Sequence, residues 1–147
     1  MRVGQELTIR VMSSTDGQLF LFNQDSDGRS YQIFPNRFSG RDVIGQSQMQ
    51  ISAGMIVTVP GPTDGFALRI TPPTGLNRLI AVVVPPSVRI DDIAQKHADM
   101  GTFDNVDSIL EEIARRERQA RTEKGVAVEE AAPKNRAVGI WVYEIVP

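Results

Sequence analysis

The chain of 147 residues has no cysteine and one histidine, His97. Without cysteine, neither a disulfide nor a thiolate metal site can hold the fold, and one imidazole cannot complete a usual zinc site. Long apolar runs are missing too. The longest, at residues 79–84, spans six residues, whereas a transmembrane helix requires about 20. The sequence therefore predicts no metal site, no cofactor and no membrane span.

A strong charge of one sign is also absent. The chain has 16 basic residues (Lys and Arg) and 18 acidic ones, for a formal net charge of −2. This balance provides no field that would steer a polyanion to the surface, so we expect no nucleic-acid partner. The sequence also lacks a phosphate loop and the GxSxG elbow of a serine hydrolase. Familiar catalytic signatures therefore do not reveal a function.

Short apolar strands, each bounded by turn residues, are what the sequence does contain. Residues 19–22 and 31–34 are expected to pair across a polar turn, and residues 79–84, apolar on both faces, to lie centrally in a sheet. The last strand, at residues 138–146, places Trp141 and Tyr143 on one face, which favours a core position for both over a binding groove. This pattern predicts an antiparallel β-sandwich.

Helical periodicity interrupts the strands near the C-terminus. Residues 91–97 predict a short helix and residues 104–121 a longer one. The apolar stripe of the longer helix ends at Ile113, so its second half is expected to project into water. The prediction is a single domain over residues 1–147, mainly β, with a helical insertion at about 91–136 before the last strand.

Two polar motifs admit a metal-binding or catalytic interpretation. Residues 23–28 resemble the first half of a calcium loop, yet Phe34 stands where the closing acid belongs, which favours a polar hairpin turn. Whether this turn binds calcium stays open. An enzyme would have to use Asp91, Asp92 or His97, but adjacent acids at a helix start have a simpler role, since they complement the helix dipole. We expect a protein that is not an enzyme.

Short motifs in the first 86 residues carry a family resemblance. They are Ile33-Phe34-Pro35-Asn36, Ala53-Gly54, Val59-Pro60 and Pro73-Thr74-Gly75. In this order and spacing they resemble the bacterial family catalogued as domain of unknown function 4384, over residues 5–86 and more loosely around Trp141. The resemblance implies an accessory module without catalytic residues, often fused C-terminally to a caspase-like peptidase or a protein kinase, or found in exported proteins. It also implies the periplasm or cell envelope rather than the cytoplasm.

The residues and the resemblance together predict a non-catalytic, protein-binding accessory module. We expect it to be the C-terminal domain of a larger bacterial protein, which it positions on a protein partner or an envelope surface. The expected contact residues combine an aromatic with arginines, a composition enriched at interface hot spots. They are Asn36, Arg37, Phe38 and Arg41 in the loop at 36–47, and Arg115, Arg116 and Arg118 on the projecting helix. The alternative is a structural subunit of a bacterial secretion or cell-surface assembly that uses the insertion helix; the oligomeric state stays open.

Overall fold

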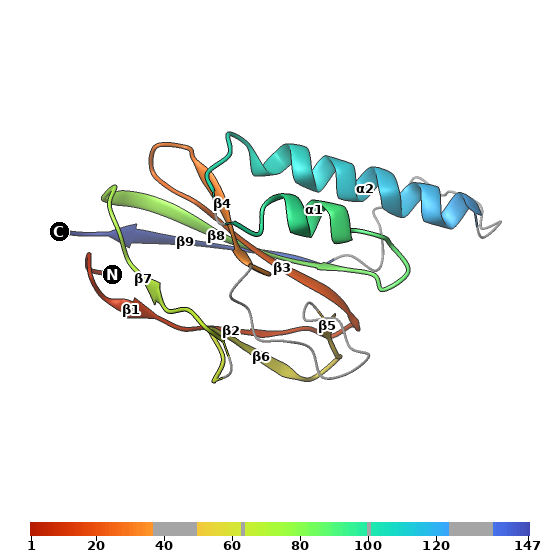
Figure 1. Cartoon of the computed structure of the whole chain (residues 1–147), viewed down its shortest axis with the longest axis horizontal. Coiled ribbons are helices and arrows are strands. Elements are labelled where there is room, and N and C mark those ends of the chain that lie inside the picture. The colour runs from red at the N-terminus through yellow and green to blue at the C-terminus, as the bar shows by residue number, and fades with distance from the viewer. Residues whose placement is uncertain (37–49, 63, 100, 124–136) are drawn as a thin grey trace.

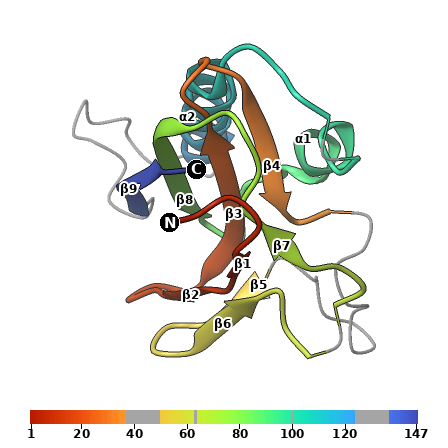
Figure 2. The same cartoon turned by 90° about the vertical axis from the view of Figure 1, so that its left-hand side faces the viewer.

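The computed structural model describes residues 1–36, 50–62, 64–99, 101–123 and 137–147. Three layers are visible in Figures 1 and 2: a central sheet, short strands on one face of it, and helices on the other. The elements are β1 (Glu6–Leu7), β2 (Ile9–Met12), β3 (Gly17–Gln24), β4 (Ser30–Phe34), β5 (Gln50–Ile51), β6 (Ile56–Val59), β7 (Leu68–Arg69), β8 (Gly75–Val84), α1 (Asp91–Lys96), α2 (Val106–Glu123) and β9 (Ala137–Ile145).

The central sheet is antiparallel and has the order β4-β3-β8-β9, with β5 pairing at the start of β3. The predicted hairpin is confirmed, since Leu21 lies opposite Phe34 and Asn23 opposite Tyr31. The apolar run at 79–84 is confirmed as central: it belongs to β8, which lies between β3 and β9. Fully apolar residues suit this strand because both of its faces are covered.

One face of the central sheet packs against the layer of short strands, β1 with β7 and β2 with β6. Alternate residues of the central strands, such as Leu19, Leu21 and Val83, form one buried cluster with Ile9 and Val59 from this second layer. The predicted antiparallel sandwich is confirmed in this arrangement of two strand layers around an apolar core.

The opposite face of the sheet carries the helices (Figure 1). Phe20, Phe22 and Val82, which point away from the strand layer, are buried with Ile109 and Ile113 of α2. Both helices lie between β8 and β9 in the sequence, as predicted for the insertion. The helical layer therefore encloses a second apolar cluster on the outer face of the sandwich.

The second half of α2 was predicted to project into water, and this prediction is wrong. Glu117 is only 4% exposed, and Ala120 packs against the same apolar cluster as Ile113. Residues four apart lie on one face of a helix, so the buried stripe continues from Ile113 to Glu117 although the residue type changes. At its other end, α2 is capped by Asn105, whose Oδ1 accepts a hydrogen bond of 2.8 Å from the Asp107 N–H.

Candidate functional site

Within the described residues, β9 forms an open edge of the central sheet. Among the described strands β9 pairs with β8 alone. The N-terminal segment covers only its end: the Val146 N–H donates to the Met1 carbonyl at 2.8 Å, and the Val3 N–H donates to the Val146 carbonyl at 3.1 Å. The ammonium group of Met1 donates to the Glu144 carbonyl at 3.0 Å.

The remaining length of this edge presents unpaired backbone groups. In an antiparallel ladder, successive residues direct their N–H and C=O groups alternately to the two sides of a strand. Because Glu144 and Val146 face outward, positions 138, 140 and 142 face outward as well. No hydrogen bond from the described part of the chain reaches these three positions. β9 therefore offers a row of donors and acceptors to an added strand.

Apolar side chains flank this row. Ile140, Trp141 and Val142 are 54%, 53% and 63% exposed, respectively. The core position predicted for Trp141 is therefore wrong, whereas Tyr143 is half-buried and its hydroxyl donates to Asn23 Oδ1 at 2.6 Å. The indole lies along its own strand: a Cβ added at Gly139 would stand 2.8 Å from the Trp141 ring. An exposed run of this kind marks an interaction surface more often than a solvated edge.

The opposite edge of the sheet, formed by β4, is covered. The Ser30 N–H and C=O both pair with the Phe103 backbone at 2.8 Å. Gln32 is buried, and its amide donates to the Ala94 carbonyl of α1 at 3.0 Å. Pro35 then ends the strand, since it has no N–H to offer a neighbour. The helical layer thus covers the β4 edge of the sheet, whereas the β9 edge is open.

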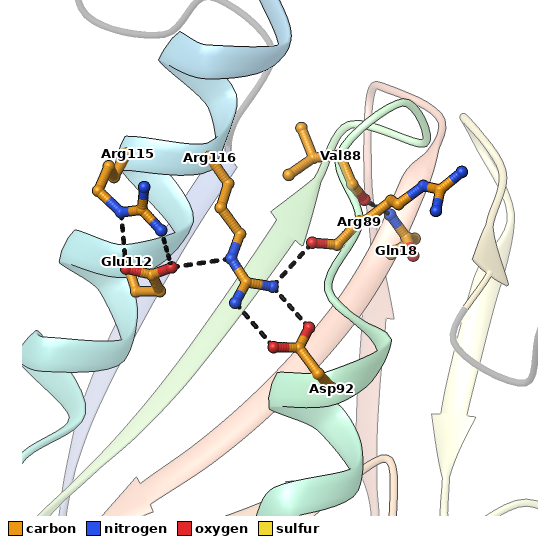
Figure 3. Close-up of polar contacts among 7 residues, drawn as sticks. All are labelled: Gln18, Val88, Arg89, Asp92, Glu112, Arg115 and Arg116. Carbon is orange, nitrogen blue, oxygen red and sulfur yellow. Dashed lines mark hydrogen bonds and ion pairs between the residues drawn. The ribbon is translucent and has the colours of Figure 1, made fainter.

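Arg116, a predicted contact residue, instead joins the helices to each other (Figure 3). Its NH1 and NH2 atoms lie 2.6 and 2.7 Å from the two carboxylate oxygens of Asp92 at the start of α1. Its Nε donates to Glu112 at 2.9 Å and NH1 also donates to the Arg89 carbonyl at 3.0 Å. The guanidinium therefore has a structural role within the chain, and a partner contact at Arg116 stays a prediction.

This network sets the protonation of its acids. The hydrogen-bonded guanidinium of Arg116 lowers the pKa of Asp92 to about 2. Arg115 and then Arg116 lower the pKa of Glu112 to about 2 in the same way. The pKa of Arg116 is raised, chiefly by its bond to Asp92. Opposite charges within hydrogen-bond reach favour the ionised forms, so the network is fully charged at neutral pH.

Arg115 and Arg118 are exposed on α2. The Arg115 guanidinium donates two hydrogen bonds to the Glu112 carboxylate, from Nε to Oε2 at 2.9 Å and from NH2 to Oε1 at 2.5 Å. Arg115, Arg116 and the neighbouring Gln119 also line a shallow hollow of about 270 Å³ against the loop at 85–90. A partner contact at Arg115 and Arg118 stays a prediction.

The loop predicted as a second contact surface begins at Asn36, which is 2% exposed. Its amide donates to the Ile33 carbonyl at 2.7 Å and closes the end of β4. A partner contact at this residue stays a prediction. Arg37, Phe38 and Arg41 lie outside the residues that the structure describes.

Two of the three residues that an enzyme hypothesis would use, Asp92 and His97, line a groove between α1 and α2. Glu112 lines the same groove. The His97 ring lies against Phe103, with the ring centroids 4.4 Å apart and the ring planes tilted by 41°. Burial lowers the pKa of its imidazole. Asp92 is already bound to Arg116 and Asp91 is exposed on α1. In the described chain no three of His, Cys, Asp and Glu gather as a metal site.

The turn at residues 23–28 is a closed hairpin connection. Asp25 Oδ1 accepts hydrogen bonds from the backbone N–H groups of Asp27 and Arg29, at 2.9 and 3.1 Å. Gly28 has a φ of 85°, the left-handed conformation that glycine adopts readily. Asn23, which would be the first ligand of a calcium loop, is buried and bonded to Asn77 and Tyr143.

These observations define a mainly antiparallel β-sandwich module with a helical layer and one open sheet edge. No helix within the described ranges is both long and apolar enough to cross a membrane. The chain belongs to the family described as "Domain of unknown function (DUF4384)", whose model matches residues 1–85. No curated protein and no solved structure matches the chain. The family match ends where β8 ends, so the helices and β9 lie beyond it.

Sequence reasoning missed the open edge at β9 because it assigned Trp141 to the core. One signal was present in the sequence. Natural edge strands are often protected by charged residues or by proline. Residues 137–143 contain neither.

Proposed function

We propose that this protein is a non-catalytic protein-binding module that engages its partner along the outer edge of β9. A partner segment in extended conformation adds to the central sheet as a further strand. As a domain of a larger bacterial protein, the module thereby positions that protein on its partner. The single observation that carries the proposal is the uncharged outer edge of β9, with Ile140, Trp141 and Val142 each more than half exposed.

The chemistry of this surface explains how such a partner is held. The outward backbone groups of positions 138, 140 and 142 supply main-chain hydrogen bonds, which are the source of affinity when a strand is added to a sheet. The apolar side chains on both faces of β9 supply the pockets that select alternate residues of the added strand. A partner segment rich in β-branched or aromatic residues fits best, because such residues pack on a pleated apolar surface.

The proposal is tested by affinity capture from an extract of the source cells. Three forms of the chain are compared by quantitative mass spectrometry: the wild type, Ile140→Lys/Val142→Lys, and the control Met12→Lys/Ile56→Lys. Met12 and Ile56 are also exposed apolar residues, paired on β2 and β6 in the other strand layer. Both double variants therefore add the same charge and remove two exposed apolar side chains.

We expect the wild type and the control to capture the same protein, and the β9 variant to lose it. A partner that all three forms capture equally would overturn the assignment of the function to β9.

A further inference from the structure

We propose that the strand added to β9 is the β9 strand of a second copy of this chain. This inference rests on the proposed function and names the partner for the same surface. The two copies pair antiparallel about a two-fold axis that passes beside Ile140, so that their central sheets become continuous. The open edge of β9 is complementary to a second copy of itself.

The free positions are symmetric about Ile140. The N-terminal segment occupies the outer edge at Glu144 and Val146, which leaves positions 138, 140 and 142 open. In an antiparallel pair centred on Ile140, position 140 faces its own copy and position 138 faces 142. All three outward positions then meet outward positions of the second chain. This is the requirement for paired hydrogen bonds between antiparallel strands.

The side chains fit the same register. Position 141 lies opposite 139 of the second copy. Because each Trp141 indole lies over Gly139 of its own strand, the two indoles come side by side across the axis, on one face of the joined sheet. Like charges directly opposite each other would oppose pairing. Residues 137–143 contain no charged residue, so this repulsion is absent. An interface in which the same patch serves both partners is the isologous type that closes after two copies.

The test uses the purified chain alone, by sedimentation velocity from about 5 µM to about 500 µM, the range suited to a small interface. We expect a monomer–dimer equilibrium for the wild type. Ile140→Lys and Ile140→Glu should each raise the dissociation constant at least about tenfold, because each variant sets like charges opposite one another across the axis. The control Met12→Lys should dimerise like the wild type.

Mixing the two variants gives the decisive measurement. If position 140 faces itself, an equimolar mixture of Ile140→Lys and Ile140→Glu should form a heterodimer, since Lys and Glu then lie opposite each other. Hydrogen exchange followed by NMR should show protection of the Ile140 and Val142 amides that increases with protein concentration in the wild type. A wild type that stays monomeric at the highest concentration overturns self-pairing, as does a mixture that fails to associate.

The two proposals fail in distinguishable ways. If the purified chain is monomeric but the extract yields a partner that the β9 variant loses, self-pairing is wrong and the binding edge stands. If the chain is monomeric and no capture depends on β9, both are wrong. A dimer that persists unchanged in Ile140→Lys uses another surface and also overturns the inference.

Discussion

Arg116 and Asp92 join the middle of α2 to the first turn of α1 through two parallel contacts, NH1 to Oδ1 at 2.6 Å and NH2 to Oδ2 at 2.7 Å. A guanidinium and a carboxylate match in this geometry, and a lysine in place of Arg116 would not reproduce it. The pair fixes how the helices lie on each other and on the loop at 85–90 (Figure 3).

The first prediction concerns this pair. Arg116→Met should lower the free energy of unfolding by about 1–2 kcal/mol, because it removes several charge-assisted hydrogen bonds at a partly solvated site. Urea denaturation followed by circular dichroism measures the change. The matched control is Arg115→Met. The Arg115 guanidinium is exposed, and in Figure 3 it is bonded to Glu112 and not to α1. This control should leave the denaturation midpoint unchanged, and an equal loss in both variants would contradict the structural role of Arg116.

A second prediction concerns acid stability. Asp92 and Glu112 have folded pKa values of about 2, below their ordinary values of about 3.9 and 4.3. A depressed carboxyl pKa contributes stability that is complete above the unfolded value and is lost as the pH falls toward the folded one. The stability advantage of the wild type over Arg116→Met should therefore shrink between about pH 5 and about pH 2. Urea titrations across this range test it; a constant difference would show that the pair does not titrate as described.

The single histidine allows a third prediction. Burial against Phe103, then the charge of Lys96, lowers the pKa of His97, although Asp99 acts in the opposite direction. The imidazole should titrate below about 6.5 in a proton NMR experiment. Because the folded state disfavours the protonated ring, its contribution to stability is complete above the unfolded pKa and decreases as the pH falls below it. A titration midpoint above the ordinary value would contradict the packing of His97 on Phe103.

The fourth prediction concerns the close approach of β3 to β8. A Cβ at Gly17 would lie 2.5 Å from the Val84 carbonyl oxygen and 2.6 Å from a Val83 methyl carbon. Backbone atoms cannot move aside as a flexible side chain does, so Gly17→Ala should destabilise the fold by about 1–3 kcal/mol. Gly101→Ala is the control, since its nearest neighbour is the exposed Asp99 side chain at 3.2 Å. Thermal melting of both variants distinguishes them, and equal melting temperatures would refute the tight contact.

The strand pairing and the helical insertion were predictable because they depend on local patterns. The polar turn between residues 19–22 and 31–34 leaves few ways to pair two apolar strands. Their pairing is confirmed, with Leu21 opposite Phe34 and a shift in register between Leu21 and Phe22. The spacing of the apolar residues placed α2, whose buried Ile109 and Ile113 lie on the sheet. Local periodicity specifies which side of an element is apolar.

Local periodicity does not specify what covers that side. Alternation placed Trp141 on the face that is buried elsewhere in the sheet, but β9 is an edge strand and the indole is half exposed. Glu117 is the reverse case: its charge suggested solvent, yet its helical position directs it to the core. Asn36 begins the loop expected at residues 36–47, while its amide completes the end of β4. The exposure of Trp141 and the burial of Glu117 depend on tertiary neighbours far away in the sequence, whereas the Asn36 bond spans only three residues.

The two edges of the central sheet limit how far strand addition could go. A sheet with two open edges can add neighbours indefinitely and grow into a fibre, as unprotected β proteins do. Within the described residues, Ser30 pairs with Phe103 and Gln32 bonds to Ala94 of α1 at the β4 edge. Under the self-pairing proposed above, both ends of the joined sheet would be β4 edges, and the assembly would stop at two molecules.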